Sequence, residues 1–212
     1  MITNRKHLGW YRPRNLPHFD SPRLPQFVTF RLRDSLPVGV ASLRAGETEP
    51  AYRRRLETAL DVGAGACWLS RPELAQIVRD GLLHGCGHTH DMHAFVIMPN
   101  HVHALTTFRE NYRLCDVVRG WKSYSARRIN AMLGQNGAFW QREYFDRFIR
   151  DEAHFERARS YIEHNPVSAG LTNTAESWRF GSLSGVGVRP DEGVGVDADP
   201  PRRATSCFFG GP

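Results

Sequence analysis

Long apolar runs are missing from this chain of 212 residues. A helix that crosses a membrane needs about 18 or more consecutive apolar residues, and no stretch reaches that length, so we expect no membrane span. The charged first residues, Met1 to His7, are not followed by the apolar stretch of a signal peptide. We therefore expect no signal peptide.

Paired cysteines are missing as well. The four cysteines, at positions 67, 86, 115 and 207, show no CxxC spacing, which predicts reduced thiols in a cytoplasmic protein. The stretch from Cys86 to His93 contains histidines but lacks a second pair of ligands at a recognised zinc-site spacing. It does not by itself predict a structural zinc site.

Basic residues are in excess. Lys and Arg number 28 against 22 Asp and Glu, which gives a net charge of +6 and an isoelectric point of about 9.5. Arginine carries most of this charge, and its planar guanidinium favours bidentate contacts with phosphate. The balance suits a polyanionic partner such as nucleic acid, but a basic composition alone does not identify one.

The order of predicted elements indicates the fold class. Periodicity and turn residues predict a strand at 26–33, helices at 48–60 and 71–84, a hairpin at 92–108, a helix at 113–133, a strand at 139–149 and a helix from 151 to about 164. This order predicts an α+β protein with a ferredoxin-like split βαβ core. Such a core has a four-stranded antiparallel sheet with helices on one face, and we expect the C-terminal helix to close over the sheet.

Several boundaries follow from local signals. Ser70 and Glu73 are expected to form a capping box with Pro72 in the first turn. Pro166 is expected to end the last helix, since proline disfavours helical geometry in the residue before it. We expect an irregular basic arm over 1–25, one folded domain over 26–184, and a flexible tail rich in Gly and Pro over 185–212.

The turn Pro99-Asn100 precedes two histidines in the second strand of the hairpin. Side chains alternate between the faces of a strand, so His101 and His103 share one face. Two imidazoles that converge in this way are half of a metal site. The alternative is a pair of partly exposed surface histidines.

The last predicted helix carries a second candidate pair. Tyr161 and Asn165 are four residues apart and therefore neighbours on one face of the helix. A phenol beside an amide oxygen suits metal-assisted phosphoryl transfer, in which the phenol attacks phosphorus and the amide completes the coordination of the metal. The alternative is that Tyr161 simply packs in the core. His164 is a rival ligand, but it should face elsewhere because one residue is about 100° around the helix.

These motifs resemble those of a known family. His101-Val102-His103 resembles the HUH motif of the single-tyrosine endonucleases. The chain also resembles the IS200-like single-strand DNA transposases, and among them the REP-associated tyrosine transposases. The resemblance covers about residues 7–183 and rests on five stretches, in this order: 27–37, 98–103, 121–124, 139–147 and 161–170.

The resemblance implies roles for single residues. It makes Tyr161 the catalytic nucleophile, His101 and His103 metal ligands, and Asn165 the third ligand of a divalent ion, Mg²⁺ or Mn²⁺. It also implies the ferredoxin-like core, over which 26–184 would be the transposase or endonuclease domain. Tyr124 and Tyr144 are expected to be structural. No convincing general base is visible, because Glu163 lies on the wrong face of the helix.

Basic residues on the 113–133 helix are candidate DNA contacts. Arg119, Lys122 and Arg127 cluster on one arc of this helix, beside Trp121, which either packs in the core or stacks on bases. The alternative is a solvated basic face.

The function that follows is a metal-dependent single-strand DNA endonuclease and strand transferase, acting on hairpin-forming repeat DNA through a 5′-phosphotyrosine intermediate. Two other classes remain open: a relaxase-like or replication-initiator-like nickase, and a catalytically silent protein that binds single-stranded nucleic acid. We expect no small-molecule cofactor and no membrane partner, a cytoplasmic protein associated with the nucleoid, and either a monomer or a dimer.

Overall fold

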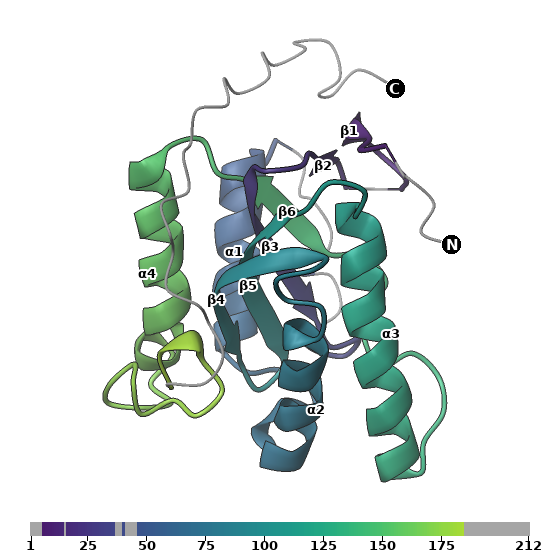
Figure 1. Ribbon diagram of the computed structural model, residues 1–212. Coiled ribbons are helices and arrows are strands. Elements are labelled where there is room, and N and C mark those ends of the chain that lie inside the picture. The colour runs from purple at the N-terminus through teal and green to yellow at the C-terminus, as the bar shows by residue number, and fades with distance from the viewer. Residues whose placement is uncertain (1–5, 15, 37–39, 41–45, 185–212) are drawn as a thin grey trace.

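A computed structural model describes residues 6–14, 16–36, 40 and 46–184 (Figure 1). The strands are β1 (Gly9–Tyr11), β2 (His18–Asp20), β3 (Pro25–Arg31), β4 (His90–Ile97), β5 (His101–Phe108) and β6 (Phe145–Phe148). The α-helices are α1 (Glu49–Asp61), α2 (Pro72–Leu83), α3 (Leu114–Leu133) and α4 (Glu152–Ser168), with short 3₁₀ turns at Trp68–Ser70 and Ser182–Ser184. The predicted α+β class is confirmed.

The central sheet has four strands in the order β4-β5-β3-β6, and every neighbouring pair is antiparallel. This is the strand order of the ferredoxin-like split βαβ fold, with α2 and α3 as the two crossover helices. Figure 1 shows α2 and α3 in front of the sheet. The predicted core fold is therefore confirmed.

Alternation along the strands gives the sheet two buried faces. On the first face, Val28 and Val102 belong to the larger hydrophobic core, together with residues of α2 and α3. On the second face, Phe27, Val96 and Leu105 pack with Phe155, Ala158 and Ile162 of α4. His101 and His103 alternate with Val102, so both point to the second face, which α4 covers.

Helix α1 also lies on this second face. Its Tyr52 ring lies 6.2 Å from the ring of Phe145 in β6, and Phe145 pairs with Thr29 of β3 on the same face as His103. At the other end of α1, the Asn100 side-chain amide donates to the Leu60 and Ala64 carbonyls, both at 3.1 Å. The helices therefore cover both faces of the sheet, and α1 is an addition to the expected set on one face.

Two predicted boundaries in the middle of the chain are wrong. Ser70 belongs to a 3₁₀ turn that runs directly into α2, so the N-cap is Arg71 and no side chain caps the helix. Only residues 145–148 of the predicted strand 139–149 pair with β3. Phe139 and Trp140 are buried in the first core instead, where the Trp140 indole N–H donates to the Ser125 hydroxyl at 3.0 Å.

The last helix does not end before Pro166. Helix α4 continues to Ser168 with Pro166 inside it, and Pro166 is buried. Proline removes one intrahelical hydrogen bond, but the turn is held by bonds from the Ala169 N–H to the Asn165 carbonyl and from the Leu171 N–H to the Pro166 carbonyl, both at 2.9 Å. Asn165 is therefore helical and stays on the face of Tyr161.

The buried apolar stripe of α3 does not include Met132 in the last turn of the helix. Leu114, Val118, Trp121 and Ile129 are buried, but Met132 is 54% exposed. The three described cysteines, Cys67, Cys86 and Cys115, are free thiols, as expected. Among the described helices, none is both long and apolar enough to cross a membrane.

The predicted irregular arm contains a hairpin, so that part of the prediction is wrong. Strands β1 and β2 pair antiparallel, and the ring of Phe19 packs on Phe148 of β6 at 4.9 Å. The buried Asp20 carboxylate accepts hydrogen bonds from the backbone N–H groups of Leu8 and Leu114. The predicted tail, 185–212, lies outside the described residues.

The Asp20 bonds generate a stability prediction. Leu114 is the first residue of α3, whose N-cap, Arg113, provides no side-chain bond, so Asp20 caps this helix from a distant part of the chain. Replacing Asp20 by Ala leaves two backbone donors without a partner and should cost about 1–3 kcal/mol of unfolding free energy in urea denaturation. The control, Asp80→Ala on the exposed face of α2, should stay within about 0.5 kcal/mol. Equal losses for the two variants would contradict the capping role.

Candidate active site

The two histidines of β5 converge on one point. The Nε2 atoms of His101 and His103 lie 3.1 Å apart, with the two ring centroids 4.7 Å apart and the rings inclined by 75°. Both side chains are buried, at 1% and 0% exposure, which excludes the alternative of a surface pair. The expected same-face geometry is confirmed.

A hydrogen bond to Nδ1 fixes the orientation of each imidazole. The Asn100 side chain donates through its nitrogen to two backbone carbonyls, so its oxygen accepts from Nδ1 of His101, at 2.7 Å. Thr29, the cross-strand neighbour of His103, holds Nδ1 of that ring through its hydroxyl at 2.7 Å. A proton on Nδ1 leaves the Nε2 lone pair free, which is the tautomer that a metal ligand needs.

Burial also favours the neutral form of both rings. It lowers the pKa of His103 to about 3, and it lowers the pKa of His101 well below its ordinary value, with a further contribution from His103. The buried site offers no solvent to an imidazolium ion, so the charged form is disfavoured. Both rings are therefore neutral at physiological pH, as metal coordination requires.

Helix α4 places Tyr161 and Asn165 beside the histidines. The Tyr161 ring lies 5.5 Å from the His103 ring and 5.9 Å from the Phe27 ring. Asn165 is only 2% exposed, and both its Oδ1 atom and the Tyr161 hydroxyl are buried without a formed hydrogen bond. Buried polar atoms are nearly always paired, so two adjacent orphan oxygens beside two imidazole nitrogens indicate a site for a ligand.

Burial of Tyr161 raises its pKa. The carboxylates of Glu57 and Asp61, in α1, raise it further, whereas the nearby Asn165 amide and the Arg147 guanidinium lower it. The phenol is therefore protonated and a poor nucleophile in the protein alone. A cation close to its oxygen would favour the phenolate.

The donor set suits a divalent ion. Two neutral imidazoles and one amide oxygen are accepted ligands of Mn²⁺ and, with water, of Mg²⁺. No three His, Cys, Asp or Glu side chains in the described part of the chain lie close enough together to hold an ion. Asn165 carries a buried amide oxygen without a hydrogen bond, four residues after Tyr161 on α4.

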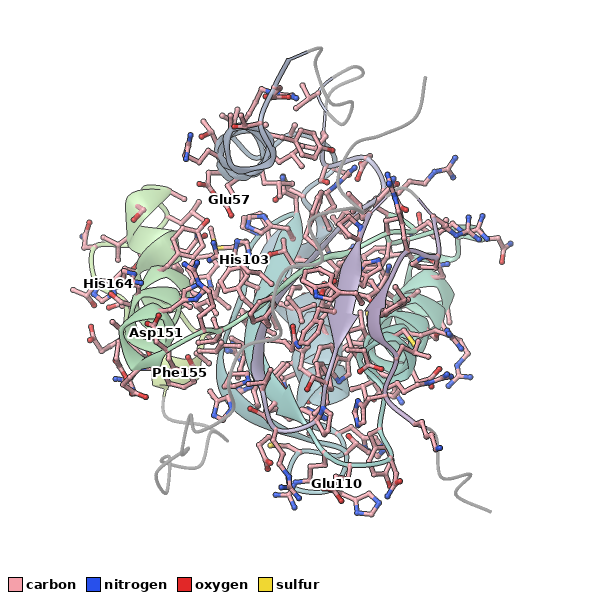
Figure 2. All side chains as sticks on the ribbon, turned by 90° about the horizontal axis from the view of Figure 1, so that it is seen from above. Glu57, His103, Glu110, Asp151, Phe155 and His164 are labelled. Carbon is pink, nitrogen blue, oxygen red and sulfur yellow. The ribbon has the colours of Figure 1, made fainter. Side chains whose placement is uncertain are left out.

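The rival residues lie elsewhere. His164 is exposed, its Nδ1 bonds the Ser160 carbonyl at 3.0 Å, and Figure 2 shows it pointing away from His103. Tyr144 bonds the Tyr11 hydroxyl at 3.1 Å, and burial raises its pKa strongly. Tyr124 packs against the first core, on the opposite side of the sheet from the histidines.

The predicted DNA contacts are not next to this site. Arg119, Lys122 and Arg127 belong to α3, which packs on the first face of the sheet, whereas Tyr161 lies on the second. Arg119 and Arg127 are exposed. The Lys122 ammonium donates to the Gln141 and Arg142 carbonyls, both at 2.8 Å, and burial lowers its pKa to about 8.

Sequence reasoning missed the residues that support the site. Thr29 and Asn100 hold the two imidazoles, and only the position of Asn100 in the turn before His101 gave any signal. Arg147 of β6 lies over the Phe27 ring, 5.6 Å from its centre. Glu57 and Asp61 come from a helix whose place in the fold was not predicted.

The chain is similar to known proteins over the segment that carries this site. Residues 81–165 match the family model described as "Transposase IS200 like", and this segment contains His101, His103, Tyr161 and Asn165. A protein of Haemophilus influenzae, provisionally named a REP-associated tyrosine transposase, is 25% identical over 100 residues. The match covers 42% of this chain and 57% of that relative, so the chain spans little more than half the relative's length.

A solved structure shares the fold. It is the structure of a REP-associated tyrosine transposase bound to a REP hairpin, and it matches with a TM-score of 0.54 and 15% identity. The match covers 84% of this chain and 88% of that one. The family model and the curated relative confirm the resemblance carried by the motifs: the chain is similar to the IS200-like transposases and, among them, to a REP-associated tyrosine transposase, and the solved structure shares its fold.

Proposed function

We propose that this protein is a metal-dependent single-strand DNA endonuclease and strand transferase of the transposase type. One observation carries the proposal: the orphan oxygens of Tyr161 and Asn165 lie on one helix face beside the two buried imidazoles of the sheet. A nucleophile, two nitrogen ligands and an amide oxygen are the parts that such chemistry needs. The family match over 81–165 supports the same reading.

His101, His103 and Asn165 would hold a divalent ion, Mg²⁺ or Mn²⁺. When bound, this ion would supply Lewis-acid polarisation of the scissile phosphate and charge that favours the phenolate. The protein's own residues orient the metal ligands and the nucleophile. Asn100 keeps His101 in one tautomer, Asn100 and Thr29 orient the two rings, and the packing of α4 on the sheet keeps Tyr161 beside them.

Tyr161 would act as the nucleophile. Its oxygen forms a bond to phosphorus in line with the leaving 3′ oxygen, the P–O3′ bond breaks, and the phenol proton is lost as the 3′ oxygen gains one. The products are a 5′-phosphotyrosine and a free 3′-OH. Attack by a second 3′-OH reverses these bond changes and rejoins DNA without ATP, because the covalent bond stores the energy of the phosphodiester.

The substrate we propose is hairpin-forming repeat DNA with an unpaired segment. The relative of similar fold was solved with a REP hairpin, and the basic composition of this chain suits a polyanion. Arg119, Lys122 and Arg127 remain our candidates for phosphate contacts. Because α3 and Tyr161 lie on opposite faces, DNA that reaches both must extend around the edge of the sheet.

The first test concerns the metal. We expect one Mn²⁺ per chain in isothermal titration calorimetry and no binding by His103→Ala. Thr29→Val removes the bond that orients His103 at nearly constant volume, and losses of this kind weaken metal binding about tenfold. The control Thr174→Val, on an exposed loop, should bind like the parent protein. Unchanged affinity of Thr29→Val would exclude the assigned orientation of His103.

The second test concerns the nucleophile. Tyr161→Phe keeps the ring contacts with Phe27 and His103 but has no oxygen to attack, so it should bind a labelled hairpin normally and leave it uncut. Parent protein should form a covalent adduct with the fragment on the 3′ side of the cleavage site, joined through its 5′ phosphate and visible by denaturing electrophoresis. Tyr144→Phe should keep the adduct. An adduct on Tyr161→Phe would move the nucleophile elsewhere, and binding without cleavage by the parent would indicate a silent binding protein.

The third test concerns the DNA. Unpaired bases can stack on aromatic side chains and be read, whereas a perfect duplex keeps them paired, so hairpins with single-stranded segments should bind much more tightly. The double variant Arg119→Ala and Arg127→Ala should weaken all ligands alike and flatten the salt slope by roughly one unit per lost phosphate contact. We separate Lys122 from this pair, since its removal also disturbs the 141–142 loop. Equal affinity for duplex and hairpin at every salt concentration would refute the single-strand assignment.

A further inference from the structure

Helix α1 presents two carboxylates to the candidate site. Glu57 and Asp61 are four residues apart and therefore share one face of the helix. Figure 2 shows Glu57 pointing from α1 toward the side of the sheet that carries His103. Both charges are near enough to Tyr161 to act on its hydroxyl.

The C-terminal end of α1 is tied directly to the histidine turn. Asn100 donates to the carbonyl of Leu60, the residue before Asp61, and to that of Ala64. The same Asn100 side chain accepts the bond from His101. One amide therefore ties the backbone on either side of Asp61 to the turn that carries His101.

Asp61 lacks the partner that a buried carboxylate needs. Its Oδ1 atom is buried and makes no hydrogen bond. Burial, with the nearby Glu57 charge, raises the pKa of Asp61 to about 6, so the carboxylate is destabilised in the protein alone. A second and independent sign of a missing ligand comes from α4, where the Asn165 oxygen is also orphaned in a side chain only 2% exposed.

The Arg147 guanidinium of β6 partly offsets their effect, but the two α1 carboxylates beside the proposed nucleophile oppose the proposed reaction. They raise the pKa of the Tyr161 phenol, and they repel a DNA phosphate at the same place. A divalent ion between the carboxylates and the phosphate would instead lower the pKa of Tyr161 and attract the phosphate. The charge arrangement therefore favours cation recruitment by α1.

We infer that Asp61 holds the divalent ion of the site through metal-bound water, as an outer-sphere ligand supplied by α1. The inference rests on the proposed function and adds a residue to its metal site. Among the described residues no three acidic, histidine or cysteine side chains are grouped around one point, so Asp61 does not join His101 and His103 in such a group in this conformation. Mg²⁺ usually keeps several waters, and these donate to nearby carboxylates.

The test is a titration of the full chain with MnCl₂ at pH 8, where Asp61 is ionised in the parent protein. Asp61→Asn keeps the shape of the side chain and removes its charge, and it should weaken Mn²⁺ binding about tenfold with the stoichiometry still one. Asp61→Ser should behave in the same way, which guards against an effect of the amide itself. Asp80→Asn, an exposed change of the same kind on α2, should leave the affinity unchanged. Circular dichroism and thermal melting check that each variant is folded.

The outcomes separate the two proposals. If the parent binds Mn²⁺, His103→Ala does not, and the two Asp61 variants bind like the parent, the role of Asp61 is wrong and the proposed function stands. If the parent itself binds no Mn²⁺, the metal site fails and the role of Asp61 fails with it.

Discussion

The candidate site depends on two imidazole nitrogens that are held 3.1 Å apart on a buried face of the sheet. Two such nitrogens can lie this close only if at least one is an unprotonated acceptor, and burial keeps both rings neutral. Their positions follow from strand alternation in β5, and their orientations follow from Asn100 and Thr29. Everything else in the site is arranged around this pair: Tyr161 and Asn165 from α4 and the carboxylates from α1.

The fold explains how three distant segments meet at that pair. The β4–β5 hairpin presents the histidines on the second face of the sheet, and the C-terminal helix packs on the same face. This packing uses Phe155, Ala158 and Ile162, which alternate along α4 with the site residues Tyr161 and Asn165. The apolar stripe of α4 therefore packs on the sheet and stabilises the helix, and the adjoining stripe places Tyr161 and Asn165 in the site.

The sequence predicted the structure best where the spacing of apolar or chemically active residues matches the period of a strand or a helix. The hairpin, α3 and the strand order follow from alternation and helical spacing, and the convergence of His101 and His103 follows from the period of a strand. The end of α4 was mispredicted because Pro166 is a local signal, whereas the helix is held past it by backbone bonds and burial. Strand 139–149 was overextended because the apolar residues Phe139 and Trp140 enter the core, where Trp140 makes only an isolated antiparallel bridge with Leu32.

The supporting residues could not be predicted, because their roles arise from tertiary contacts. Thr29 reaches His103 only through the register of β3 and β5, and Asn100 reaches α1 only through the packing of that helix on the second face. Glu57 and Asp61 belong to no motif in the sequence that would connect them with the histidines. The sequence placed Arg119, Lys122 and Arg127 on one arc of α3, but it could not show that the sheet separates this helix from Tyr161 or that Lys122 is bonded to a neighbouring loop.

The most direct measurement of the central claim is an anomalous diffraction map from crystals of the protein soaked in Mn²⁺. The account predicts a single strong peak in contact with Nε2 of His101, Nε2 of His103 and Oδ1 of Asn165, with the Tyr161 hydroxyl beside it. A peak elsewhere in the molecule, with these three atoms unoccupied, would contradict the assignment of the metal site and the mechanism built on it.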